Sequence, residues 1–350
     1  LSTRIRLARN FAGEAFPGWA DSTQRASVLE RCLEQLAPLP AFKEGVFLDI
    51  ADLTDLERQV LVERRLVSRE LIEATDGSAV LVAPSQNLAI MVNEEDHLRI
   101  QGLQSGFNLR KAWDEVDALD NQIEEHLDYA FSDTYGYLTA CPTNVGTGMR
   151  ASAMLHLPGL VMRGHMEKVV RMVSQLGMAV RGSSGEGSEA TGSIFQISNQ
   201  QTLGESEEQI LKRLISILHA IIEQESNARG LLLEKQPSVI LDKIGRAYGI
   251  LRNGHLLSSQ EAVNHLSLMR LAVDFSMWPA EKRAQIDRLA MEVQPGHVQC
   301  MANADIAPEE RDELRATRLR EQFASFPTLD LSTIQPMPNP NPKNHDGTNE

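Results

Sequence analysis

The alternation of apolar and polar residues around positions 93–99 predicts a β-hairpin. Apolar residues recur at every second position over 88–92, and the same pattern resumes over 98–101. A period of two is typical of strands with one buried face. The tip carries Glu94, Glu95 and Asp96 in succession. Adjacent carboxylates repel each other, so one is hard to ionise unless a cation lies among them. The alternative interpretation is an acidic tip in solvent.

Residues 1–10 alternate in the same way and place Arg4 and Arg6 on one face of a strand. Two guanidinium groups on one face suit a polyphosphate, whereas the alternative is a solvated edge strand. Further strands are predicted over 47–50, 78–82, 137–140, 151–157 and 194–198. Apolar residues at helical spacing predict helices over 21–36, 54–74, 108–131, 160–177 and 206–224.

From 227–230 onward the pattern becomes almost wholly helical. Helices are predicted over 237–249, 258–275, 279–293 and 308–323, and the Pro- and Asn-rich tail over 335–350 should be disordered. We therefore expect a first domain over 1–229, a helical domain over 230–330 and a disordered tail over 331–350.

The composition excludes several classes of protein. Of the 350 residues, 42% are hydrophobic and 23% are charged, as in an ordinary globular protein. The net charge of −14 disfavours nucleic acid as the main partner and suits a basic substrate. Cys32, Cys141 and Cys300 form no CxxC pair, so neither a zinc site nor a disulfide framework is indicated, and no residue is assigned to a metal. With no membrane-length apolar run and no signal peptide, we expect a cytoplasmic protein.

The common phosphate-binding loops are not found, because the sequence has no GxxxxGK[ST] and no GxGxxG between a strand and a helix. If a nucleotide binds, arginines must neutralise its phosphates. Suitable arginines stand at predicted strand ends or turns: Arg4, Arg6, Arg99, Arg150 and Arg181. Cys141 ends a predicted strand just before Pro142. A buried structural thiol and a partly exposed thiolate beside arginines are both compatible with that position.

Several segments, in this order, resemble motifs of one family. They are STRIRLARN (2–10), NEEDHLR (93–99), CPTNVGTGMR (141–150), RGSSGEGSEA (181–190) and FQISN (195–199). They resemble the phosphagen (guanidino) kinases and, within that family, the bacterial protein arginine kinases, over residues 1–225. The resemblance implies an α+β fold: a large, mainly antiparallel sheet flanked by helices, followed by a helical C-terminal domain.

The resemblance also implies roles for individual residues. Glu95 and Glu186 match the carboxylates that orient the substrate guanidinium, and Cys141 matches the cysteine that contacts it. The arginines named above would hold the phosphates of ATP, which acts together with Mg²⁺. The remaining residues placed along the nucleotide are Ser2, Thr3, Ile5, Arg65, Ala151, Ser152, Ala153, Met154, Gly182, Ser183, Ser184 and Gly185. Arg65 and Met154 stand where the family has histidines near adenine, so the adenine contacts stay open.

The segment 311–316, RDELRA, matches an RDxxRA motif of the protein arginine kinases. There the resemblance implies an allosteric phosphoarginine pocket formed by Arg311, Asp312 and Arg315. On a helix, Arg311 and Arg315 are four residues apart on one face, which lets them clamp one phosphate. The alternative is an ordinary charged helix face.

The implied function is a kinase that transfers the γ-phosphate of ATP to arginine side chains of proteins. Two carboxylates fix the plane of a guanidinium and one accepts its proton, while arginines and Mg²⁺ take up phosphoryl charge. The expected partners are proteins with exposed arginines, an activator protein, a Clp-type protease or chaperone that receives the marked proteins, and a second copy in a homodimer. Neither nucleic acid nor a membrane is expected as a partner. Two alternatives are a kinase of free arginine or another small guanidine, and a phosphoarginine-binding adaptor without catalysis.

Overall fold

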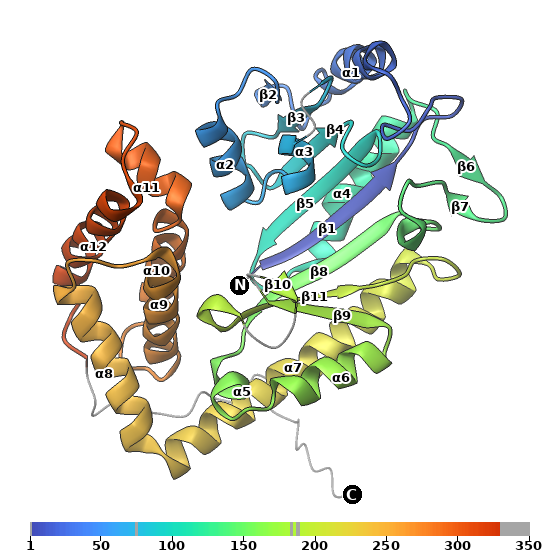
Figure 1. The fold of residues 1–350 in the computed structure, drawn as a ribbon. Helices are drawn as coiled ribbons and strands as arrows, with labels where there is room; N and C mark the ends of the chain where they lie inside the picture. The colour runs from blue at the N-terminus through green and yellow to red at the C-terminus, as the bar shows by residue number, and fades with distance from the viewer. Residues whose placement is uncertain (1, 74–75, 183–184, 187–189, 330–350) are drawn as a thin grey trace, which may run out of the picture.

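The chain folds into a large antiparallel sheet flanked by helices, followed by a group of helices at its C-terminal end (Figure 1). The computed structural model describes residues 2–73, 76–182, 185–186 and 190–329. In this part of the chain the sheet order is β10-β9-β11-β8-β1-β5-β4-β3-β2. Every neighbouring pair is antiparallel. The predicted α+β fold is confirmed.

The elements have the following bounds. The strands of the large sheet are β1 (Ser2–Arg9), β2 (Val46–Asp49), β3 (Ala79–Val82), β4 (Leu88–Val92), β5 (Leu98–Ser105), β8 (Met149–His156), β9 (Met178–Gly182), β10 (Gly185–Glu186) and β11 (Ile194–Asn199). A separate pair is β6 (Phe131–Ser132) and β7 (Gly136–Tyr137). The helices up to the end of the sheet region are α1 (Ser22–Leu36), α2 (Asp55–Glu63), α3 (Arg69–Glu73), α4 (Leu109–Glu124), α5 (Pro158–Met162), α6 (Met166–Gln175) and α7 (Glu207–Lys235). The C-terminal helices are α8 (Pro237–Asn253), α9 (Ser259–Asp274), α10 (Lys282–Glu292), α11 (Pro295–Ala302) and α12 (Pro308–Ala324), and short 3-10 turns are η1 (Pro142–Asn144) and η2 (Thr191–Ser193).

Strand β1 lies near the middle of the sheet, between β5 and β8. Its alternation sends Ile5 and Leu7 into the main core, which they share with residues of α1, α4, α6 and α7. Arg4 and Arg6 therefore lie on the opposite face. On that face, α2 and α3 pack over β3 and β4 in a smaller core that contains Leu61, Leu71 and Met91. The part of this face around β1, β5 and β8 is left for polar side chains.

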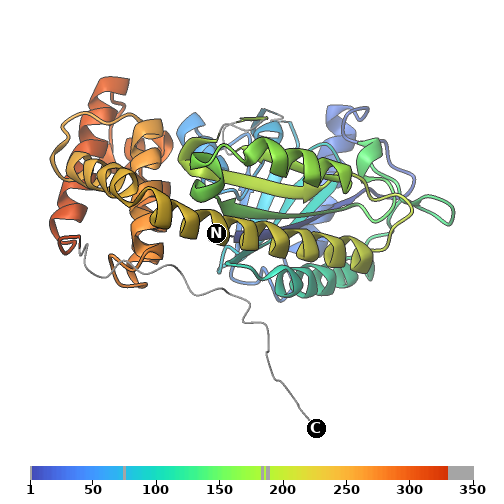
Figure 2. The same cartoon turned by 90° about the horizontal axis from the view of Figure 1, so that it is seen from below.

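Helix α7 joins the sheet region to the C-terminal helices without a break (Figure 2). Ser206 begins it by accepting a hydrogen bond from the Gln209 backbone nitrogen. Ile210 lies in the main core, whereas Leu232 lies in the core of the C-terminal helices. The predicted helix end near residue 224 is wrong, because the apolar face of α7 continues from one core into the next. The boundary at 229 stays a prediction, and it falls inside this helix.

Two predicted helices are divided by residues with left-handed backbone. The helix predicted over 54–74 is α2 and α3, because Arg65 has φ 62° and Ser68 accepts a hydrogen bond from the Leu71 nitrogen at the start of α3. The helix predicted over 160–177 is α5 and α6, separated at Gly164 with φ 66°. A residue with left-handed backbone cannot continue a right-handed helix, so Arg65 ends α2 and Gly164 separates α5 from α6.

Three other expectations need correction or lie outside the described residues. Helix α4 ends at Glu124 rather than at 131, and the strand predicted over 137–140 is only β7, after which the chain turns into η1. Helix α11 was not predicted. The tail predicted to be disordered, 331–350, lies outside the residues that the structure describes.

Candidate active site

Arginine side chains gather on the open face of the sheet. Arg4 and Arg6 come from β1, Arg150 lies directly opposite Arg6 on β8, and Arg99 lies opposite Ala8 on β5. Burial, helped by repulsion from neighbouring arginines, lowers the pKa of Arg4 to about 10. The same causes lower the pKa of Arg6 well below its usual value.

Three of these four cations are not neutralised by the described part of the chain. Within it, Arg4, Arg6 and Arg150 have no carboxylate at ion-pair distance. The buried Nε atoms of Arg6 and Arg150 also have no hydrogen-bond partner in the part of the chain that the structure describes. Buried cations are normally paired, so this arrangement indicates a site for an anionic ligand of high charge.

Arg65 and Arg181 border the cluster from two sides. Arg65 sits in the turn between α2 and α3, where its carbonyl oxygen accepts a hydrogen bond from Gln101 Nε2 at 2.8 Å. Burial lowers the pKa of Arg65, and its charge contributes to the lowered pKa of Arg4. Arg181 on β9 contributes in the same way to the lowered pKa of Arg150, after burial. The structure thus brings together the predicted phosphate-binding arginines.

The predicted hairpin is β4 and β5, and its acidic tip is not in solvent as a whole. Glu94 is buried and forms an ion pair with Arg99, with 2.5 Å between Oε2 and Nη1. Glu95 is 44% exposed and lies 3.8 Å from Nη2 of Arg99. Burial, together with the charges of Asp96 and Glu94, raises the pKa of Glu95. Glu95 is therefore the tip carboxylate that is accessible and disposed to accept a proton.

Asp96 and His97 hold the tip in place, and sequence reasoning missed them. Asp96 Oδ1 accepts hydrogen bonds from Asn10 Nδ2 and from the Ala140 nitrogen, both at 2.6 Å. His97 Nδ1 accepts one from the Phe11 nitrogen at 3.1 Å. Burial lowers the pKa of His97 to about 4, so the ring is neutral near pH 7. The run of polar residues at the tip was the only sequence signal for this network.

Cys141 follows directly after the residue that Asp96 holds. It is partly exposed, precedes η1, and has its Sγ 3.0 Å from Thr143 Oγ1. It lies close enough to Arg150 to act on the pKa of that guanidinium. Through Asp96, the tip that carries Glu95 and the turn that carries Cys141 are tied together.

A cavity of about 250 Å³ opens beside Glu95. Its lining includes Thr139 and Ala140 from the chain before Cys141, and Phe16 and Trp19 from the loop before α1. Trp19 is 90% exposed. The cavity has room for the end of an arginine side chain next to a carboxylate.

Some predicted residues are not brought to this face. The side chains of Ile5, Ala151 and Ala153 lie in the main core, and Thr3 is buried on the same side. Their contact with a nucleotide stays a prediction that concerns the backbone alone. Ser2, Ser152 and Met154 share the face of Arg4, since Ser2 pairs with Met154 and Arg4 with Ser152.

The Gly-rich segment is described in part. Gly182 and Gly185 pair between β9 and β10, and Glu186 pairs with Arg181. Ser183 and Ser184 lie outside the described residues, as does the side chain of Glu186. The roles of these residues stay predictions.

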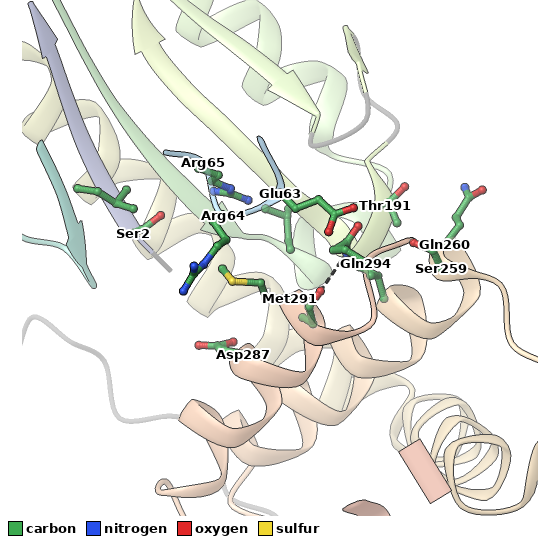
Figure 3. Close-up of a pocket in the computed structure, with 14 residues that line it drawn as sticks. Ser2, Glu63, Arg64, Arg65, Thr191, Ser259, Gln260, Asp287, Met291 and Gln294 are labelled. Atoms are coloured by element: carbon green, nitrogen blue, oxygen red, sulfur yellow. Dashed lines mark hydrogen bonds between the residues drawn. The ribbon is translucent and has the colours of Figure 1, made fainter. Parts of the chain in front are cut away.

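A second, larger cavity of about 560 Å³ separates the sheet from the C-terminal helices. Ser2, Arg64 and Arg65 face Met291 and Gln294 of the α10 region across it (Figure 3). Two of the predicted nucleotide residues, Ser2 and Arg65, thus lie at this cavity. Nothing in the sequence pattern pointed to the C-terminal residues on its other side.

The predicted phosphoarginine residues lie on α12, on the far side of the C-terminal helices. Arg315 is 2% exposed, and its Nε and Nη1 each donate to a carbonyl oxygen, of Val293 and Leu257, at 2.7 Å. It also pairs with Asp312. Arg311 is partly exposed. These hydrogen bonds attach α12 to the neighbouring helices. Phosphate binding by Arg311, Asp312 and Arg315 stays a prediction.

The described residues contain neither a cluster of metal ligands nor a membrane-spanning helix. No group of three or more His, Cys, Asp or Glu side chains there is arranged to hold a metal ion. No helix in that part of the chain is long and apolar enough to cross a membrane.

Comparisons with known proteins agree with this geometry. The family model described as ATP:guanido phosphotransferase, C-terminal catalytic domain, matches residues 27–228, and that of the protein-arginine kinase McsB C-terminal domain matches residues 237–334. Relatives named protein-arginine kinase from Bacillus cereus (strain AH820) and Bacillus mycoides (strain KBAB4) are each 44% identical over 325 residues, which is 92% of this chain and 92% of theirs.

Solved structures of guanidino kinases are also similar. The substrate-free duplicated taurocyamine kinase from Schistosoma mansoni has 27% identity and a TM-score of 0.56, over 65% of this chain and 32% of that one. Lombricine kinase has 26% identity and a TM-score of 0.56, over 67% of this chain and 66% of that one. The chain therefore belongs to the ATP:guanido phosphotransferase family, in the group of the protein-arginine kinases.

Proposed function

We propose that this chain transfers the γ-phosphate of ATP to arginine side chains of proteins. The observation that carries the proposal is the open sheet face. There Arg4, Arg6 and Arg150 have no carboxylate partner among the described residues, while Glu95 and Cys141 lie nearby. The arginines suit a triphosphate, and the carboxylate and thiol suit a guanidinium cation. The name of the relatives, protein-arginine kinase, agrees with this pair of ligands.

The reacting nitrogen must lose a proton, because a guanidinium with a pKa above ~12 is a poor nucleophile. Burial raises the pKa of Glu95, which makes its carboxylate a stronger base. As the nitrogen–phosphorus bond forms, the proton passes to Glu95 and the bond from the γ-phosphorus to the bridging oxygen of ADP breaks. ADP leaves with that electron pair, and the product is phosphoarginine.

The arginine cluster supplies electrostatic stabilisation. Burial and then repulsion from neighbouring arginines lower the pKa of Arg4, and the phosphates of ATP would relieve that repulsion on binding. ATP enters as its magnesium complex. We assign Mg²⁺ to the phosphates of ATP, where it would take up part of the charge on the transferred phosphoryl group. Alignment of the two substrates would then account for most of the rate enhancement.

Several finer proposals rest on the net charge of the chain or on the family resemblance. We infer that basic protein substrates are drawn to a chain of net charge −14. We also propose an activator protein, delivery of phosphorylated proteins to a Clp-type protease, a homodimer, a cytoplasmic location and allosteric phosphoarginine binding at Arg311, Asp312 and Arg315. The proposed parts remain a catalytic domain over 1–229 and a helical domain over 230–330, in line with the two family models.

One observation favours a second candidate, a kinase for a small guanidine. The cavity beside Glu95 has about 250 Å³, enough for a free guanidine, and the similar solved structures are kinases of taurocyamine and lombricine by name. The two candidates differ in the acceptor that carries the phosphoryl group.

The test is incubation with labelled ATP and an arginine-rich protein, followed by acid treatment of the product. A phosphoramidate is acid-labile, whereas a serine or threonine phosphoester is stable in acid. Acid-labile label on protein, insensitive to excess free arginine, supports the proposal. Label on free arginine alone supports the second candidate. Full activity of Glu95→Ala would contradict the mechanism.

A further inference from the structure

Ser2 and Arg65 line the cavity of about 560 Å³ between the sheet and the C-terminal helices (Figure 3). Ser2, which lines it, stands two residues from Arg4 on the same face of β1. Arg65, which also lines it, is close enough to Arg4 to act on the pKa of that guanidinium. A ligand whose phosphates lie on Arg4 and Arg6 therefore has this cavity at one end.

The two walls of the cavity suit a purine base. Val263 of α9 and Ala290 and Met291 of α10 present apolar surface, and Gln294 just after α10 adds an amide. Gln294 Nε2 already donates to the Ala290 carbonyl oxygen at 2.9 Å. The rest of the lining is largely polar and includes the carboxylates of Glu63 and Asp287 beside Arg64. Apolar surface combined with polar groups is usual in a small-molecule site, and the volume is within the common range of about 300–1,000 Å³.

The walls are fixed relative to each other by a contact between distant parts of the chain. The carboxylate of Glu63, at the end of α2, accepts hydrogen bonds from the Gly296 nitrogen (2.8 Å), the His297 nitrogen (3.1 Å) and His297 Nδ1 (2.6 Å). These groups lie in the first turn of α11. The contact comes two residues before Arg65, so it positions the turn that carries Arg65 against the C-terminal helices.

We propose that the C-terminal helices α9 and α10 form one wall of the adenosine part of the ATP site, so that the nucleotide binds between the two parts of the chain. This inference rests on the proposed function, because ATP places the base beyond the phosphates. It gives the C-terminal helices a direct role in nucleotide affinity.

The test fills the cavity from the C-terminal side. Ala290→Trp places an indole in the slot, and Ala284→Trp, at an exposed position on the same helix, is the matched control. Calorimetry measures the binding of ATP and, separately, of inorganic tripolyphosphate, which needs only the arginine cluster. We expect Ala290→Trp to weaken ATP binding by about tenfold or more, since the base loses its buried contacts, and to leave tripolyphosphate binding unchanged. Equal ATP affinity in both variants would overturn the inference.

A milder variant keeps the test decisive if the indole disturbs folding. Met291→Ala removes apolar contact without adding bulk, and should weaken ATP binding by about threefold with no effect on tripolyphosphate. An unchanged ATP affinity in Met291→Ala would count against the wall in the same way. The readout here is ATP binding. If the wild-type chain bound ATP but phosphorylated no arginine, the proposed function would be refuted, whereas this inference would not.

Discussion

Arg229 offers a quantitative test of how the two parts of the chain are joined. It is 8% exposed and bonds to Glu225 at 2.5 Å, Asp274 at 2.6 Å and the His156 carbonyl oxygen at 3.1 Å. The partners belong to α7, the end of α9 and the end of β8. Arg229→Met keeps much of the apolar stem but removes the charge, and so leaves two buried carboxylates without their shared cation.

Breaking a buried ion pair by removing one partner costs about 3–5 kcal/mol. Here the carboxylates keep other donors: Asp274 accepts from Arg283 at 2.6 Å, and Glu225 accepts from the Gly159 and Leu160 nitrogens at 2.8 and 2.9 Å. We therefore expect a loss of about 3 kcal/mol in the free energy of unfolding, at the low end of that range.

The loss should depend on pH in a defined direction. Burial raises the pKa of Glu225 even though Arg229 opposes that shift. Without Arg229 the folded-state pKa of Glu225 rises further. As the pH falls toward the ordinary pKa of a glutamate, protonation of Glu225 therefore removes the unpaired charge. The stability difference between wild type and Arg229→Met should accordingly shrink at acidic pH and be largest at neutral pH.

The assay is urea unfolding followed by circular dichroism at several pH values. Arg246→Met is the control, because its pair with Asp242 at 2.8 Å lies on an exposed face of α8 and should contribute less than about 0.5 kcal/mol. A loss for Arg229→Met as small as that of the control would refute the reasoning. Glu225→Gln combined with Arg229→Met should recover part of the loss.

The remaining predictions concern the site and the sheet. Glu95→Gln should lower kcat by about 10²–10⁴-fold through loss of the general base, whereas Glu125→Gln, at an exposed position, should leave kcat unchanged. Initial rates with ATP and a protein substrate measure both effects. An intact kcat in Glu95→Gln would exclude the base role. Because burial raises the pKa of Glu95 above its ordinary 4.5, kcat/KM should increase with pH through a value above 4.5, and a flat profile there would argue for another base. Gly102→Ala should lower the free energy of unfolding by about 1–3 kcal/mol, because the added Cβ would lie 2.4 Å from Val116 Cγ2 between β5 and α4. Thermal unfolding measures the loss, and an unchanged melting temperature would show that α4 can shift at no cost.

The sequence predicted the elements whose pattern is local. The period of two in β1 placed Arg4 and Arg6 on one face, and the same period bounded the hairpin around Glu95, because one face of each strand is buried. The helix break at Arg65 could not be predicted, since a left-handed arginine has no compositional signal. Its geometry is set by surrounding contacts, among them the hydrogen bond from Gln101.

Long-range contacts account for most of what the sequence did not reveal. Glu63 meets His297 across 234 residues, and no periodicity connects the two. The cavity between the sheet and the C-terminal helices depends on such contacts, so its lining could be identified only in the folded chain. The phosphoarginine role of Arg315, implied by the family resemblance, stays a prediction, and the helical pattern could not show that its guanidinium also donates to two backbone carbonyls.

The unbroken course of α7 limits where this protein can be divided for expression or for exchange with a related chain. A cut at 229 divides the helix, and it leaves Leu232 with the C-terminal helices whose core that side chain fills. A join at Gln236, where the backbone leaves the helix before Pro237, keeps α7 whole but assigns Leu232 to the first part. Either division separates Arg229 from Asp274, its buried partner at the end of α9. Chimeras should therefore fold only when the exchanged part supplies matching residues at both contacts.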